Sequence, residues 1–104
     1  YARRNAGKVA LVSLAAAAGQ PDIPSAVETT LRNYAIQKTS APPGGTTESL
    51  RVLLQREGID EALLVRWQRL LEQAALLRYG GQADDPRALL DEARRCIAAM
   101  EGRG

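Results

Sequence analysis

Two pairs of neighbouring carboxylates are the residues of this sequence whose type and spacing most resemble a site of chemistry. They are Asp60 with Glu61, and Asp84 with Asp85. Such pairs can act as general acid and base, or bind a metal ion. Each pair, however, stands where a helical pattern begins, and there carboxylates cap free backbone N–H groups and offset the helix dipole. We therefore expect structural roles for Asp60 and Asp85, and neither an enzyme nor a metal or cofactor site.

The absence of histidine narrows the chemistry further. The chain has no His and one cysteine, Cys96, so the usual zinc sites, Cys-His dyads and Ser-His-Asp triads cannot be assembled. Cys96 stands at an apolar position of a helical pattern. We expect it to be a small buried side chain rather than a reactive thiol.

A basic stripe is the remaining candidate for a binding site. Arg66, Arg69 and Gln73 are three and four residues apart, which places them together on a helix, on the side away from its leucines. One interpretation is a solvated face with partners on the same helix. The other is that this stripe, with Arg94 and Arg95 in the next helix, binds an acidic surface of a partner protein, because arginine forms paired contacts with carboxylates.

The composition is that of a small globular domain. The chain has 104 residues, of which 45% are hydrophobic, 25% charged and 4% aromatic, with no Phe. At this length we expect one domain, residues 1–104, with a core of Leu, Ala, Val and Ile. The net charge of +2 is weak evidence for a nucleic-acid partner. A small helical nucleic-acid-binding domain with an arginine-rich surface stays the alternative function, although no recognition helix with base-reading residues is evident.

Helical periodicity and its interruptions predict an all-α fold. The N-terminal stretch has basic residues and an alanine run that look like a secretory signal peptide. We interpret it as an Ala-rich helix that ends near Gly19 and packs on the core. A second helix follows to about Lys38. The Pro- and Gly-rich segment 39–45 is then expected to be the longest loop and flexible.

Three further short helices complete a compact bundle of about five. Thr46 or Thr47 caps the third helix, which Gly58 ends. The fourth begins at Asp60, and the segment RYGGQADDP (78–86) separates it from the fifth, so that these two form an antiparallel C-terminal hairpin. A solenoid of helical repeats is the alternative, but the segments show no self-similarity at a fixed period.

The aromatic residues are expected to be structural. Trp67 and Tyr34 stand at apolar helical positions, and Trp67 should anchor the core. Arg78 and Tyr79 come at the end of the fourth helix. We expect Tyr79 to pack across the hairpin, with its hydroxyl or the Arg78 guanidinium satisfying free carbonyl groups at the helix end.

Five segments resemble those of a known family in their order and spacing. They are YAIQK (34–38), TESL (47–50), LLQREGIDEALL (53–64), LLEQAALLRYGG (70–81) and DPRALLDEARRCIAAME (85–101). Their shared features are a Tyr-x-x-x-Lys helix end, a Thr-Glu opening, Gly-Ile-Asp-Glu between helices, an Arg-Tyr pair and a closing Leu-x-Glu-Ala helix. Together they resemble the C-terminal helical domain of BatD-type proteins, the aerotolerance or oxygen-tolerance family of bacterial envelopes.

The resemblance implies a non-catalytic protein–protein interaction module on the cytoplasmic side of the bacterial inner membrane. BatD-type proteins carry an export signal, a β-rich extracytoplasmic part and a transmembrane helix before a tail of this kind. They are usually encoded beside von Willebrand factor A domain proteins and a MoxR-type AAA+ ATPase, which become the expected partners. Arg3, Arg4 and Lys8 would be the basic flank of a membrane span outside this chain. A leucine-rich chain of this size can also form a homodimer.

Overall fold

The computed structural model describes residues 2–80 and 85–102, with side chains from Arg4 onward. Within these residues five α-helices follow one another and there is no strand. The predicted all-α class is confirmed. The helices are α1 (Ala2–Ala17), α2 (Ile23–Thr39), α3 (Thr47–Arg56), α4 (Glu61–Arg78) and α5 (Pro86–Gly102).

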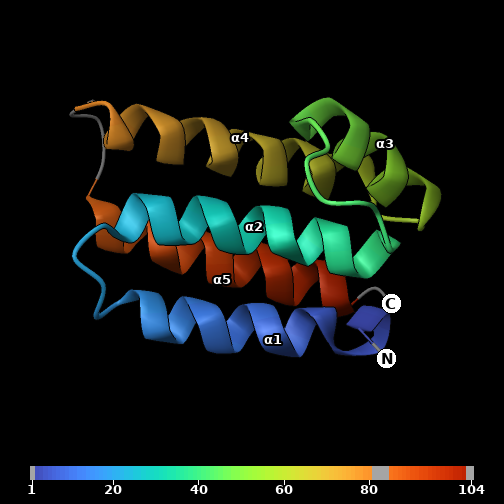
Figure 1. Cartoon of the computed structure of the whole chain (residues 1–104), viewed down its shortest axis with the longest axis horizontal. Coiled ribbons are helices and arrows are strands. Elements are labelled where there is room, and N and C mark those ends of the chain that lie inside the picture. Colours follow the sequence, from blue (N-terminus) through green and yellow to red (C-terminus); the bar gives the residue numbers. More distant parts are fainter. Residues whose placement is uncertain (1, 81–84, 103–104) are drawn as a thin grey trace.

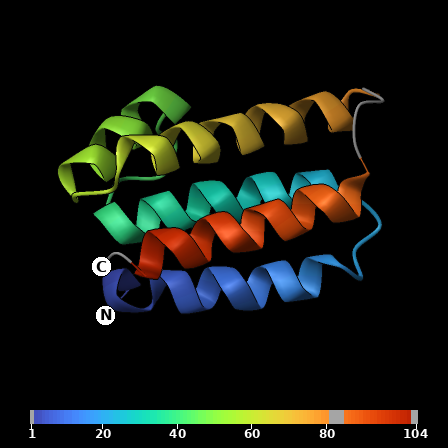
Figure 2. The same cartoon turned by 180° about the vertical axis from the view of Figure 1, so that it is seen from behind.

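Four of the helices form a bundle, and the short α3 lies at one of its ends (Figure 1). The helices α1 and α2 run in opposite directions, and so do α2 and α4 (Figures 1 and 2). The helix α2 is central, because it packs against all of the others. The predicted antiparallel hairpin of α4 and α5 is present. It brings the end of α5 back to the start of α1.

Leucine and alanine fill the core, as the absence of Phe requires. On its inner face α1 presents Ala6, Ala10 and Ala17, each at most 3% exposed, so it packs closely on α2 and α5. The largest core side chain is Trp67 of α4, which is fully buried. Its indole N–H donates a 3.1 Å hydrogen bond to the carbonyl oxygen of Leu31 in α2. Trp67 therefore fixes α4 against the central helix both by packing and by one polar contact.

Side-chain caps begin α2 and α3, and the cap of α3 lies at one of the two threonines that the sequence predicted. The Asp22 carboxylate accepts a 3.2 Å hydrogen bond from the backbone N–H of Ser25. The Thr46 hydroxyl accepts one of 3.1 Å from the N–H of Ser49. Each bond satisfies an N–H group that the first turn of a helix leaves free.

The two carboxylates predicted as caps behave differently. Asp85 accepts a 3.0 Å hydrogen bond from the backbone N–H of Arg87. Asp60 occupies the N-cap position of α4, but its side chain makes no capping hydrogen bond, so the capping role predicted for it was wrong. The preceding turn fixes the start of α4 instead. Gly58 has φ +92°, and the N–H of the buried Ile59 bonds to the Leu54 carbonyl at 3.3 Å.

The end of α4 also differs from the prediction. Tyr79 is 81% exposed and does not pack across the hairpin; its ring lies 5.5 Å from the Arg78 guanidinium. Arg78 forms an ion pair with Glu28 of α2 rather than a contact with the helix end. Backbone groups satisfy two of the carbonyl groups at this end, since the N–H of Tyr79 bonds to the Ala75 carbonyl and the N–H of Gly80 to the Leu77 carbonyl. Gly80, at φ +87°, then turns the chain out of the helix.

The segment predicted as the longest loop connects α2 to α3. The prediction placed it at 39–45, and the structure places it at 40–46. Ser40 ends α2 in the left-handed conformation, with φ 57°. The flexibility of this loop stays a prediction. Positions 81–84 of the hairpin hinge lie outside the described residues.

No helix in the described part of the chain has both the length and the apolar character needed to cross a membrane.

Candidate functional site

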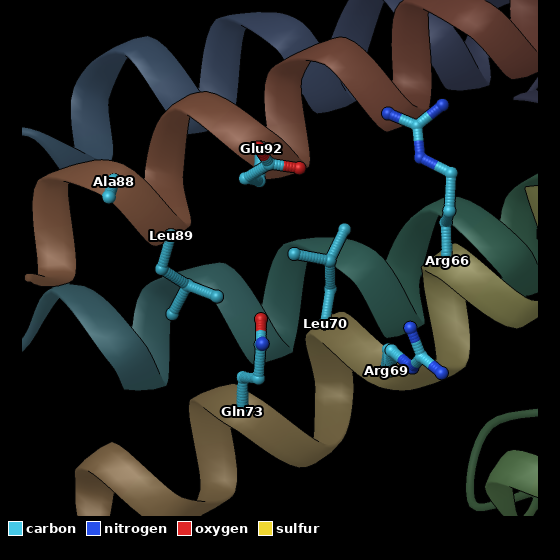
Figure 3. A pocket seen from close by; sticks show the side chains of 7 residues that line it. All are labelled: Arg66, Arg69, Leu70, Gln73, Ala88, Leu89 and Glu92. Carbon is cyan, nitrogen blue, oxygen red and sulfur yellow. The ribbon is translucent and has the colours of Figure 1, made fainter. Parts of the chain in front are cut away.

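A groove between α4 and α5 contains the predicted basic stripe. It encloses about 380 Å³, and α2 passes behind it (Figure 3). Side chains of both helices line it, with two arginines at one end (Figure 3). The lining residues are Arg66, Arg69, Leu70 and Gln73 of α4 and Ala88, Leu89 and Glu92 of α5.

The floor of the groove is apolar and already well packed. Leu70 and Leu89 point into the space between the two helices (Figure 3) and are 4% and 3% exposed. The prediction that the basic stripe lies away from the leucines therefore holds for Arg69, which is exposed on the outward face of α4, but not for Arg66 and Gln73. Arg66 and Gln73 stand one turn on either side of Leu70, at the edge where the buried face of α4 meets its exposed face.

The groove carries unneutralised positive charge. In the described part of the chain, no residue forms a hydrogen bond or an ion pair with the side chains of Arg66 and Arg69, and both residues are exposed. The acidic residue across the groove, Glu92, is already engaged, because Arg95 lies 3.5 Å from it on the same helix. A carboxylate brought into the groove would meet two guanidinium groups, which bind carboxylates through paired N–H donors.

The Arg66 side chain extends from α4 toward α5 (Figure 3). Its positive charge acts on the buried Cys96 of α5. Burial raises the pKa of the Cys96 thiol to about 11, and the Arg66 guanidinium opposes this rise. At neutral pH Cys96 is thus a protonated, buried side chain.

The second half of the predicted basic surface lies elsewhere. Arg94 and Arg95 do not line the groove. Arg95 affects the groove only through the lining residue Glu92, with which it forms an ion pair. Arg94 is exposed on α5 outside the groove. Successive residues of a helix point about 100° apart, so adjacent arginines cannot both face the same neighbour.

Sequence reasoning missed the α5 side of the groove. Ala88 and Glu92 are one turn apart, and Leu89 comes from the apolar stripe of the same helix. The sequence signal that could have identified these residues is their position at the border of the apolar stripe of α5. Residues at such a border lie beside the neighbouring helix without being buried by it.

A second polar cluster joins three helices and was not predicted. The Tyr34 hydroxyl and the Lys38 ammonium group of α2 both bind one oxygen of Glu101, at 2.6 and 3.0 Å. Gly7 of α1 lies against the Glu101 side chain, and a Cβ at this glycine would be 2.3 Å from Glu101 Cγ. Burial, together with the hydrogen bond to Glu101, raises the pKa of Tyr34. The hydrogen-bonding groups of the cluster are paired with one another, so we assign it to stability.

The described residues contain neither a metal-binding group nor a thiol beside a base. Among residues 2–80 and 85–102 no group of three or more Cys, Asp or Glu side chains is placed to hold a metal ion. The thiol of Cys96 is buried, and no base in the described residues is within hydrogen-bond distance of it. The groove between α4 and α5 is therefore the candidate functional site.

Comparison of the chain with protein-family models, with curated proteins and with solved structures found no match.

Proposed function

We propose that this chain is a non-catalytic protein–protein interaction module whose groove between α4 and α5 receives an acidic, partly apolar segment of a partner. The observation that carries the proposal is the pair Arg66 and Arg69. They stand without a partner among the described residues, beside the apolar floor of a groove.

The groove favours specificity over high affinity. Leu70 and Leu89 expose too little area to contribute much on binding. Exposed ion pairs are each worth about 0–1 kcal/mol. Two guanidinium groups about one turn apart on α4 favour a partner whose carboxylates have a matching spacing, and they speed the encounter. A partner of this kind would bind reversibly.

The family resemblance supplies a more specific proposal. In a BatD-like aerotolerance protein this module would lie on the cytoplasmic side of the bacterial inner membrane. Its partners would be a von Willebrand factor A domain protein or a MoxR-type AAA+ ATPase. The support is the order and spacing of the segments from YAIQK to DPRALLDEARRCIAAME, most of whose residues lie in helices α2 to α5.

The test is binding of the purified chain to a purified von Willebrand factor A domain protein and a MoxR-type ATPase of the same bacterium. We expect one of them to bind. We expect Arg66→Glu to weaken this binding by about tenfold or more, equivalent to about 1.4 kcal/mol. Arg94→Glu is the matched control, because it makes the same charge change at an exposed position outside the groove.

Two results would count against the proposal. If Arg66→Glu and Arg94→Glu weaken binding equally, net charge and not the groove is responsible. If the chain instead captures nucleic acid, with affinity that falls steeply as salt rises, the nucleic-acid alternative is correct.

A further inference from the structure

The outward face of α4 carries apolar side chains that the described part of the chain leaves uncovered. We call the residues Val65, Arg69, Glu72, Leu76 and Tyr79 the outer stripe. They follow one another at four- and three-residue steps; the first four lie on one side of α4, and Tyr79 is the residue directly after its end. Val65 is 38%, Leu76 61% and Tyr79 81% exposed. Half of the large apolar side chains that are exposed in the described residues thus lie on this face.

The neighbouring helix α3 covers only the beginning of this face. It packs near the N-terminus of α4, where Arg51 forms an ion pair with Glu61. The later members of the outer stripe, from Arg69 to Tyr79, are exposed. The stripe is therefore free to contact another molecule along most of its length.

The two charges in the middle of the stripe lack a partner. Arg69 and Glu72 are three residues apart, a spacing at which opposite charges can pair within a helix. The chain forms such a pair between Glu92 and Arg95. Neither Arg69 nor Glu72, however, makes a hydrogen bond or an ion pair with any described residue. A shallow hollow of about 200 Å³ lies beside them, lined in part by Val65.

The order of side chains along the stripe is symmetric about its centre. The midpoint between Arg69 and Glu72 is also the midpoint between Val65 and Leu76. A two-fold axis places residue i of one copy opposite residue j of the other, and j opposite i. With the axis through this midpoint, Arg69 of each copy faces Glu72 of the other. In the same arrangement Val65 of each copy faces Leu76 of the other.

We propose that two copies of this chain associate through their outer stripes, with the two α4 helices antiparallel about a two-fold axis at their centre. A second copy is the occupant that fits, because the charges and the apolar side chains both complement themselves about one point. The same midpoint lies between Ala62 and Tyr79, so Ala62 of each copy faces Tyr79 of the other. Ala62 is small and exposed and leaves room for the tyrosine ring. A single helix face buries less than about 1,200 Å², so the association is weak and concentration-dependent.

The experiment is sedimentation equilibrium of four proteins over a wide range of concentration: wild type, Arg69→Glu, Glu72→Arg and the double variant. We expect the wild type to dimerise, and each single variant to lose about tenfold or more in affinity, because four like charges then meet at the axis. The double variant restores opposite charges and should dimerise again. A one-to-one mixture of the two single variants should also associate, since one copy then carries only acids at the axis and the other only arginines.

Two controls keep the test independent of folding and of the groove. Helicity by circular dichroism should be equal for all variants, because both positions are exposed. Leu76→Ser should weaken the dimer without a change in helicity. Arg69 borders both the groove and the outer stripe, so Arg66→Glu separates the two proposals: it should leave dimerisation unchanged.

A wild type that is monomeric at millimolar concentration would overturn the proposal. So would single variants that dimerise as well as the wild type. Failure of the double variant and of the mixture to recover dimerisation would show that any dimer uses another surface. None of these overturning outcomes bears on binding of a partner at Arg66. A confirmed dimer would pair Arg69 with Glu72 of the other copy, and Arg66 would then be the arginine of the groove left to bind a partner's carboxylate.

Discussion

The hydroxyl of Tyr34 donates a 2.6 Å hydrogen bond to Oε2 of Glu101 and thereby ties the central helix α2 to the last turn of α5. Lys38 reaches the same oxygen at 3.0 Å. Because Gly7 of α1 lies against the same side chain, one carboxylate joins three helices at one end of the bundle. Its contacts can be removed one at a time.

Replacing Tyr34 by Phe removes one hydrogen bond and little packing. Tyr34 is 1% exposed, so the ring of Phe would fill the same space. Loss of the hydroxyl would leave Lys38 as the one remaining partner of this Glu101 oxygen. We expect a loss of about 1–2 kcal/mol in the free energy of unfolding. Urea denaturation followed by Trp67 fluorescence measures it. Tyr79→Phe is the matched control, since Tyr79 is exposed; an equal loss there would show that the contact with Glu101 contributes nothing.

Replacing Gly7 by Ala should destabilise the protein although alanine favours helix. The new Cβ would stand 2.3 Å from Glu101 Cγ, so the Glu101 side chain must move and release its two partners. We expect a loss of about 1–3 kcal/mol, against a gain of up to about 1 kcal/mol from helix propensity. The decisive measurement is the double-mutant cycle with Glu101→Ala. In the Glu101→Ala protein, Gly7→Ala should leave the free energy of unfolding unchanged or raise it. If Gly7→Ala still lowers it there, the new Cβ clashes with a group other than Glu101.

The two N-cap positions of α3 and α4 should respond differently to alanine. Thr46→Ala removes the bond to the Ser49 N–H and should cost about 1 kcal/mol. Asp60→Ala removes no capping bond and should cost clearly less. Thermal unfolding of both variants under identical conditions tests this, and an equal or larger cost at Asp60 would contradict the structure.

Alkaline pH should destabilise the fold in two steps. Burial raises the pKa of Cys96 from 9.0 to about 11, and burial with the Glu101 contact raises that of Tyr34 above its usual 10.0. Both groups stay neutral in the native state until the pH reaches their raised pKa values, which for Cys96 is about 11. The unfolded chain therefore holds fewer protons above pH 9, and the free energy of unfolding falls as pH rises. The fall begins near pH 9 for Cys96 and near pH 10 for Tyr34, and it approaches about 1.4 kcal/mol per pH unit for each group.

Two variants separate these steps. Cys96→Ala should remove the pH dependence between 9 and 10, and Tyr34→Phe should reduce the slope above 10. Denaturation curves over this pH range measure both. A slope that neither variant changes would mean that other groups cause the alkaline loss.

The helices could be predicted from the sequence because their boundaries depend on local chemistry. Asp22 and Thr46 supply capping oxygens, and Gly58 supplies a backbone that accepts positive φ. The α4 half of the groove followed from the three- and four-residue spacing of Arg66, Arg69 and Gln73 for the same reason.

The remaining features depend on contacts between distant parts of the chain. Glu101 is 67 residues from Tyr34 along the sequence, and no periodicity connects the two. The Tyr-x-x-x-Lys spacing was visible in the sequence. That the two donors, one turn apart on α2, share the acceptor Glu101 of α5 could be seen only in the structure. Arg78 likewise was assigned to its own helix end, whereas its partner Glu28 stands 50 residues earlier.

The measurement that tests the central claim most directly is a titration of the isotope-labelled chain with two helical peptides, followed by NMR. The peptides share a leucine pattern, and one carries Glu where the other carries Lys. The account predicts that the acidic peptide shifts the Arg66 and Arg69 side-chain signals and the backbone signals near Leu70 and Leu89, and that Arg66→Glu abolishes these shifts while Arg94→Glu does not. Shifts from the basic peptide at the same residues, or none from the acidic peptide, would contradict a groove for acidic partners.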